Sequence, residues 1–103
     1  MPVAFIQEFR IDGDDRSTTN SDAVSARLNV RENPPEGAIF HTAGFDEDAG
    51  VFRIFEVWET RDACDRFMRE RVMPIVEELM AGRADAAPPA REAVYELHGF
   101  MTG

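Results

Sequence analysis

The chain has 103 residues, 44% of them hydrophobic, with 20 acidic against 11 basic side chains and a net charge of -9. This length predicts one domain over residues 1–103, because domains run to about 100–150 residues. The negative charge and the lack of a basic run exclude nucleic acid and anionic membranes as expected partners.

Three further features bear on where the protein works. The longest apolar stretches, such as 3–6 and 38–40, are far shorter than the ~20 residues of a membrane span. The Met1-Pro2 start lacks the basic and apolar regions of a secretory signal, so we expect a cytoplasmic protein. The single cysteine, Cys64, excludes an internal disulfide and a multi-thiolate metal site.

The first two predicted elements are a strand and a helix. Alternation places Val3, Phe5 and Phe9 on one face of a strand that spans Val3–Arg10. Residues 17–22 offer several N-caps for a helix over Ala23–Val30, with Val24 and Leu28 as its buried stripe.

A hairpin of two strands comes next. The breaker at 33–37 precedes strands over Ala38–Gly44 and Val51–Glu59, which the turn at 46–50 joins. In the second of these strands, Phe52, Ile54 and Trp58 share one side, whereas Phe55 and Val57 share the other.

A long helix and a last strand complete the chain. Thr60 is a suitable N-cap, and the apolar spacing after it predicts one buried helix face up to about Gly82. Pro74 falls inside this pattern and should kink or restart the helix, because proline has no N–H to donate. A connector over 84–90 then leads to a strand over Arg91–Phe100.

The order β-α-β-β-α-β predicts an α+β, ferredoxin-like fold with an antiparallel four-stranded sheet. Its helices cover one face of the sheet, yet the pattern in Val51–Glu59 makes both faces apolar. An exposed apolar face needs a cover, and a second copy of the chain is the simplest one. We therefore expect a homodimer that forms a closed dimeric α/β barrel, with a cavity between sheet and helices.

The segments 37–44, 52–57 and 58–63 carry a resemblance to a known group. They resemble the small dimeric α/β-barrel proteins that are common in actinobacteria and are related to the antibiotic-biosynthesis monooxygenases. The most specific piece is Glu56-Val57-Trp58-Glu59-Thr60. The resemblance implies the fold and leaves the chemistry open, because the group includes cofactor-independent oxygenases of aromatic polyketides, haem-degrading enzymes, isomerases and non-catalytic proteins.

His41 and Glu56 are the predicted catalytic residues. An imidazole that faces a closed apolar cavity is suited to take a proton from a phenol or an enol. The alternative is that His41 is hydrogen-bonded at the dimer seam or exposed beside the helices. Burial raises the pKa of a glutamate in general, so Glu56 is a candidate acid or base, but a structural pair with Arg53 or Arg10 is favoured.

The predicted ligand-lining residues follow from the same face and from the resemblance. The resemblance implies that Trp58 lines the cavity, where its N–H can hold a carbonyl while its ring stacks on a flat ligand. The alternative for Trp58 is a core position at a strand-to-helix junction. Cys64 is either cavity-lining, as the resemblance implies, or a small hydrophobe on the helix stripe. The full set of predicted ligand-lining residues is Phe52, Ile54, Trp58, Cys64 and Phe67.

No metal or other cofactor is predicted. His41, His98 and Glu56 lack a short ligand spacing, and His98 on the last strand is expected in solvent or at the dimer contact. The acidic segments 12–15 and 46–48 lack the spacing of a calcium loop. The haem-degrading branch uses an Asn on strand one and a His on the helix after the Trp, whereas strand one here offers Gln7 or Glu8 and that helix has no His.

The sequence thus predicts a homodimer that binds a small apolar or aromatic molecule. The activity expected is cofactor-independent monooxygenation or isomerisation of an aromatic, polyketide-like substrate, started by deprotonation. The alternative is a non-catalytic binding or assembly module of the same fold. An open cavity above ~300 Å³ near Trp58 favours ligand chemistry, and a cavity filled by Phe and Met side chains favours the alternative.

Overall fold

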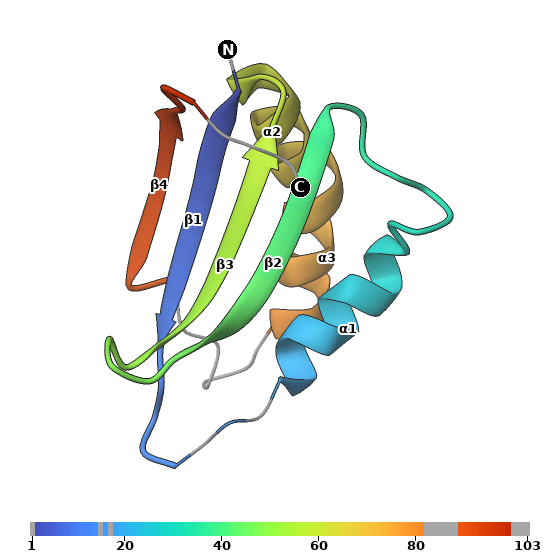
Figure 1. The fold of residues 1–103 in the computed structure, drawn as a ribbon. Coiled ribbons are helices and arrows are strands. Elements are labelled where there is room, and N and C mark those ends of the chain that lie inside the picture. The colour runs from blue at the N-terminus through green and yellow to red at the C-terminus, as the bar shows by residue number, and fades with distance from the viewer. Residues whose placement is uncertain (1, 15, 17, 82–88, 100–103) are drawn as a thin grey trace.

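The computed structural model describes residues 2–14, 16, 18–81 and 89–99. It contains a four-stranded antiparallel sheet in the order β2-β3-β1-β4, with helices on one of its faces (Figure 1). The strands are β1 (Val3–Arg10), β2 (Ala38–Asp46), β3 (Val51–Trp58) and β4 (Arg91–Glu96). This is the predicted ferredoxin-like α+β fold, in which β1 and β3 are central.

The strand predictions are confirmed closely for β1 and for the hairpin of β2 and β3, and less closely for β4. The predicted last strand extends to Phe100, which lies outside the described residues, but β4 ends at Glu96. Glu96 pairs with Val3, the first residue of β1. The Leu97 N–H still donates to the Pro2 carbonyl, after which β1 offers no further partner.

The first helix, α1 (Thr19–Leu28), begins and ends earlier than the predicted Ala23–Val30. Its N-cap is Thr18, whose hydroxyl donates to the Asp22 carboxylate at 2.8 Å. Asn29 takes a left-handed conformation with φ 48°, and this conformation ends the helix before Val30. Competing caps within one polar run explain why the sequence alone misplaced the ends.

The second helical region consists of α2 (Arg61–Phe67), a π-helical turn η1 (Met68–Val72) and α3 (Met73–Met80). Thr60 is the N-cap as predicted, since its hydroxyl accepts from the Ala63 N–H at 3.1 Å. The predicted interruption before Pro74 is confirmed and takes the form of the wider π turn. A wider turn makes room for a proline ring that would crowd the preceding helical carbonyl. No helix in the described residues is long and apolar enough to cross a membrane.

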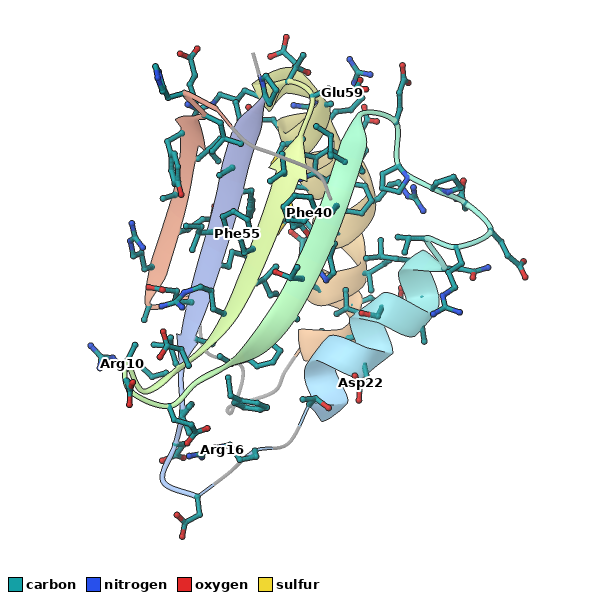
Figure 2. All side chains as sticks on the ribbon, viewed as in Figure 1. Arg10, Arg16, Asp22, Phe40, Phe55 and Glu59 are labelled. Atoms are coloured by element: carbon teal, nitrogen blue, oxygen red, sulfur yellow. The ribbon has the colours of Figure 1, made fainter. Side chains whose placement is uncertain are left out.

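The core lies between the upper half of the sheet and α2. Its buried members are Val3, Phe5, Trp58, Cys64 and Phe67. None of the described helices lies on the opposite face of the sheet. Figure 2 shows Phe40 and Phe55 on that face, and their ring centroids are 5.9 Å apart. The sheet therefore has one face turned to the helices and one open face, which is apolar around Phe40 and Phe55 but also carries the charged Glu8, Arg53 and Asp46.

Candidate functional site

Three predicted site residues meet on the helix side of β2 and β3. The register pairs His41 of β2 with Glu56 of β3, and alternation along β3 places Trp58 on the same side as Glu56. His41 Nδ1 lies 2.5 Å from Glu56 Oε2. The Trp58 indole N–H donates to the other oxygen, Glu56 Oε1, at 3.0 Å. One carboxylate thus links an imidazole to an indole.

A β-bulge decides which face His41 occupies. The register between β2 and β3 shifts by one residue between Ala38 and Phe40, because β2 contains one extra residue there. Without the shift, alternation from Ala38 would place His41 opposite Phe55 on the open face. With the shift, His41 stands opposite Glu56 on the helix side. Bulges often redirect a side chain in this way beside functional sites.

The three groups differ strongly in exposure. The Trp58 residue is 2% exposed and the Glu56 side chain 11%, whereas the His41 side chain is 57% exposed. The hydrogen bond to the Glu56 carboxylate raises the pKa of His41 above 6.5, and the carboxylate's charge adds to the effect although burial opposes it. Only the imidazole of this group is therefore open to a molecule from outside.

The expected partner of Glu56 was an arginine, and this expectation is wrong. Arg53 has the opposite strand parity, so its guanidinium lies on the open face and donates to Glu8 at 2.6 Å and to Asp46 at 2.7 Å. Arg10 belongs to the same open face as Glu8 by alternation and lies at the lower end of β1 (Figure 2). Glu56 is instead paired with a titratable histidine.

Ile54 and Phe52 extend the site along the helix side of β3. Both are half-buried, and they stand opposite Ala43 and Phe45 of β2 in the register. The rings of Phe45 and Phe52 are in edge contact with centroids 4.9 Å apart. Apolar surface therefore lies next to His41 on its own side of the sheet.

Cys64 and Phe67 are buried members of the core. Cys64 is 1% exposed, and burial raises the pKa of its thiol to about 12, which keeps it neutral. The Phe67 ring packs against the Trp58 ring with centroids 5.1 Å apart. These three side chains fill the space that the sequence predicted as a cavity.

The surface of the described residues includes two hollows beside the core. One has a volume of about 300 Å³ and the other about 150 Å³. The larger is lined by Val3, Thr60, Arg61, Asp62, Val94, Tyr95 and Glu96, and the smaller by Pro35, Glu36, Ala63, Arg66, Phe67, Glu70 and Arg71. Neither is lined by His41, Glu56 or Trp58. The His41 side chain is 57% exposed, so it presents its imidazole on the surface of the described residues.

The remaining candidates stand apart from the group. His98 follows β4 and is exposed. The 46–50 turn is held by Asp46, which accepts from the Ala49 N–H at 3.1 Å, and by Glu47, which accepts from Arg16 at 2.7 Å. Within the described part of the chain, no three His, Cys, Asp or Glu side chains cluster as metal ligands.

Sequence reasoning missed the hydrogen bond between Trp58 and Glu56. The signal was available, because residues i and i+2 of a strand share one face and an indole N–H seeks an acceptor when it is buried. The sequence analysis instead assigns the Trp58 N–H as a donor to a ligand. The contact between His41 and Glu56 could not be read in this way, since it depends on the bulge.

Comparison with known proteins supports the fold. No protein-family model and no curated protein sequence matches the chain. Among solved structures, SnoaB, a cofactor-independent oxygenase from Streptomyces nogalater, is similar with 18% identity and a TM-score of 0.63, and 99% of this chain and 98% of SnoaB are covered. Rv0793 from Mycobacterium tuberculosis is similar with 21% identity and a TM-score of 0.60, over 99% and 98% of the two chains.

A third similar structure is an inferred antibiotic biosynthesis monooxygenase from Chloroflexus aurantiacus. It has 20% identity and a TM-score of 0.60, over 99% of this chain and 98% of that one. The class defined by the structure is therefore a ferredoxin-like α+β domain. Its structural neighbours include antibiotic-biosynthesis-monooxygenase-like proteins, at an identity that shows the fold alone.

Proposed function

We propose that the protein binds a small apolar or aromatic molecule on the helix side of β2 and β3 and removes a proton from it with His41. The observation that carries this proposal is the half-exposed imidazole, held by Glu56 at 2.5 Å beside the apolar Ile54 and Phe52. A histidine placed in this way is suited to general base catalysis near neutral pH.

The proposed proton-accepting atom is Nε2 of His41. Nδ1 of His41 faces the Glu56 carboxylate, so the neutral ring carries its proton there and offers the lone pair of Nε2. A proton taken from the ligand goes to Nε2, and the imidazolium that forms is stabilised by the carboxylate. In this proposal Glu56 is a positioning residue that orients the base.

Two reactions can follow the deprotonation without a cofactor. In monooxygenation, the ligand anion gives one electron to O2, and the two radicals combine to form the C–O bond of a peroxide anion. This anion takes the proton back from Nε2 of His41 and becomes a hydroperoxide. Loss of water from the peroxide leaves a carbonyl. In isomerisation, the proton returns from Nε2 to a different atom of the ligand. The fold of SnoaB, a cofactor-independent oxygenase, supports the first reaction as a proposal for this chain.

The test uses an anthrone, whose aromatic rings flank an acidic CH2 group. We expect the protein to speed O2 uptake by the anthrone, and we expect His41→Ala to lower this rate by about 10²–10⁴-fold. His98→Ala is the matched control and should leave the rate unchanged. Hydrogen exchange of the CH2 group in D2O, without O2 uptake, would indicate deprotonation without oxidation, which is the first step of isomerisation. Full turnover by His41→Ala would remove the role of this residue.

We further propose that a second copy of the chain covers the open face of the sheet. Phe40 and Tyr95 are 37% and 44% exposed there, beside Phe55 and the buried Val57. Sheet-on-sheet packing of two copies would bury this apolar surface with two-fold symmetry.

Light scattering after size exclusion tests this dimer. We expect the mass of two chains for the protein and the mass of one chain for Phe55→Glu, which places a charge in the proposed contact. Val30→Glu changes an exposed apolar residue beyond the end of α1 and should stay dimeric. A monomeric unmodified protein would contradict the proposal.

A non-catalytic binding or assembly module is the second candidate function. The packing of Trp58 against Phe67 favours it, because these rings fill the space expected for a ligand. This candidate predicts a dimer that neither oxidises the anthrone nor exchanges its CH2 protons. The two candidates are therefore separated by the same measurements.

A further inference from the structure

Trp58 cannot contact a ligand in the way that cavity-lining tryptophans do. Its residue is 2% exposed, and its ring packs against Phe67 with centroids 5.1 Å apart. Its one polar group, the indole N–H, is already donated to Glu56 Oε1 at 3.0 Å. Neither the ring face nor the N–H is available to a molecule from outside.

The Glu56 carboxylate uses both of its oxygens, one toward each neighbour. Oε1 accepts from Trp58 and Oε2 faces Nδ1 of His41. The side chain is 11% exposed, so water offers little replacement for either contact. An unpaired oxygen of a buried carboxylate is costly, and a carboxylate that loses one donor turns toward another. The indole therefore fixes the direction of the other oxygen.

We propose that Trp58 is a positioning residue that acts through Glu56 to hold His41 with Nδ1–H toward the carboxylate and Nε2 toward the ligand. The proposal rests on the proposed function of His41 as the base. Within the described residues, no hydrogen-bond partner occupies Nε2, and the side chain is 57% exposed. Trp58 and Glu56 are thus held by buried contacts, whereas the His41 imidazole is open to solvent.

The choice of an indole as the buried anchor has a chemical reason. A neutral N–H satisfies one carboxylate oxygen without adding a positive charge, so the full negative charge of Glu56 acts on His41. An arginine in the same place would compete with the imidazole for that charge. Glu56 is the one charged group that acts on the His41 pKa in the described structure.

The test reads the imidazole of His41 by NMR, without any ligand, in a His98→Gln background that leaves one histidine. We expect the starting protein to show a His41 pKa above 6.5 and a neutral ring protonated at Nδ1. Trp58→Phe removes the N–H and frees the Glu56 carboxylate to turn away from the imidazole, so we expect the pKa of His41 to fall and both tautomers to appear. Glu56→Gln should lower the pKa further.

The decisive arm repeats Trp58→Phe in the Glu56→Gln background. If Trp58 acts through Glu56, the second substitution should then leave the His41 pKa and tautomer unchanged. An equal shift in both backgrounds, or no shift in the first one, would overturn the proposal. Phe67→Leu is the control for packing alone, since it removes ring contact with Trp58 and leaves the N–H in place.

A second variant keeps the test decisive if Trp58→Phe fails to fold. Benzothienylalanine at position 58 preserves the shape of the indole and replaces its N–H by sulfur, and it should reproduce the expected pKa fall. Because no ligand is used, failure of anthrone turnover would contradict the proposed function and leave this inference standing. Normal anthrone turnover by the protein, with a His41 tautomer that Trp58→Phe leaves unchanged, would contradict this inference and leave the proposed function standing.

Discussion

Two carboxylates near the middle of the sheet are buried alike and held differently. The Glu8 side chain on β1 is 12% exposed on the open face, and the Glu56 side chain on β3 is 11% exposed on the helix side. Glu8 accepts from Arg53 at 2.6 Å and lies 3.7 Å from Arg91. Glu56 contacts one imidazole and one indole instead.

The difference separates a structural pair from a group that can handle a proton. Arginine stays protonated at any pH near neutrality, and the Asp46 and Glu8 carboxylates raise the pKa of Arg53 still higher. The charge state around Glu8 is therefore fixed. The partner of Glu56 titrates with a raised pKa, so the charge state of this pair changes within an accessible pH range.

The largest expected difference between the two carboxylates is in their effect on turnover. Glu56→Gln removes the charge that orients and stabilises the His41 imidazolium, so we expect anthrone oxidation to fall by about 10²-fold or more. Glu8→Gln changes an equally buried carboxylate on the other face and should leave turnover unchanged. O2 uptake by the two variants measures the contrast, and equal losses would mean that both effects are structural.

The next effect tests how β2, which carries His41, is held against the helices. Gly37 has φ +85°, and a Cβ on it would stand 2.6 Å from the Cβ of Ala63. We expect Gly37→Ala to lower the free energy of unfolding by about 2 kcal/mol, because both the conformation and the space oppose a side chain. Urea unfolding measures this loss. Gly44→Ala is the control, since open space surrounds Gly44, and a loss of equal size there would contradict the explanation.

A smaller effect on stability is expected from the pair of Glu8 and Arg53. Glu8→Gln weakens the charged hydrogen bond from Arg53 and should cost about 1 kcal/mol of stability. This loss should be the same at pH 6 and at pH 8, because Arg53 stays protonated over that range. Unfolding by urea at both values checks it, and a loss that changed with pH would show that Glu8 is coupled to a titrating group.

The smallest effect is the pH dependence of the stability that the pair of His41 and Glu56 contributes. The folded state raises the pKa of His41, so the stabilisation by its protonated form is fully present below pH 6.5 and is lost as pH rises through the folded-state pKa. We expect the stability difference between the protein and His41→Gln to shrink with rising pH by less than about 1 kcal/mol, since the side chain is 57% exposed. A difference that grew with pH would reverse the sign of this linkage.

Local patterns in the sequence predicted most of the fold. Alternation in β3 correctly placed Ile54 and Trp58 on one face and Phe55 on the other, and Thr60 and Pro74 marked the helix start and its interruption. These features depend on bond geometry within a few residues, so the sequence contains them directly. The ends of α1 were missed because several polar residues offered caps of similar strength.

In the group of His41, Glu56 and Trp58, one contact follows from the local sequence and the other from the tertiary structure. The sequence by itself determined that Glu56 and Trp58 share a face, because two residues along a strand always do. Only the tertiary structure decided that His41 joins them, since an extra residue between Ala38 and Phe40 turns it to the helix side. A bulge is set by pairing and packing with another strand, and one residue of register reverses every side chain beyond it.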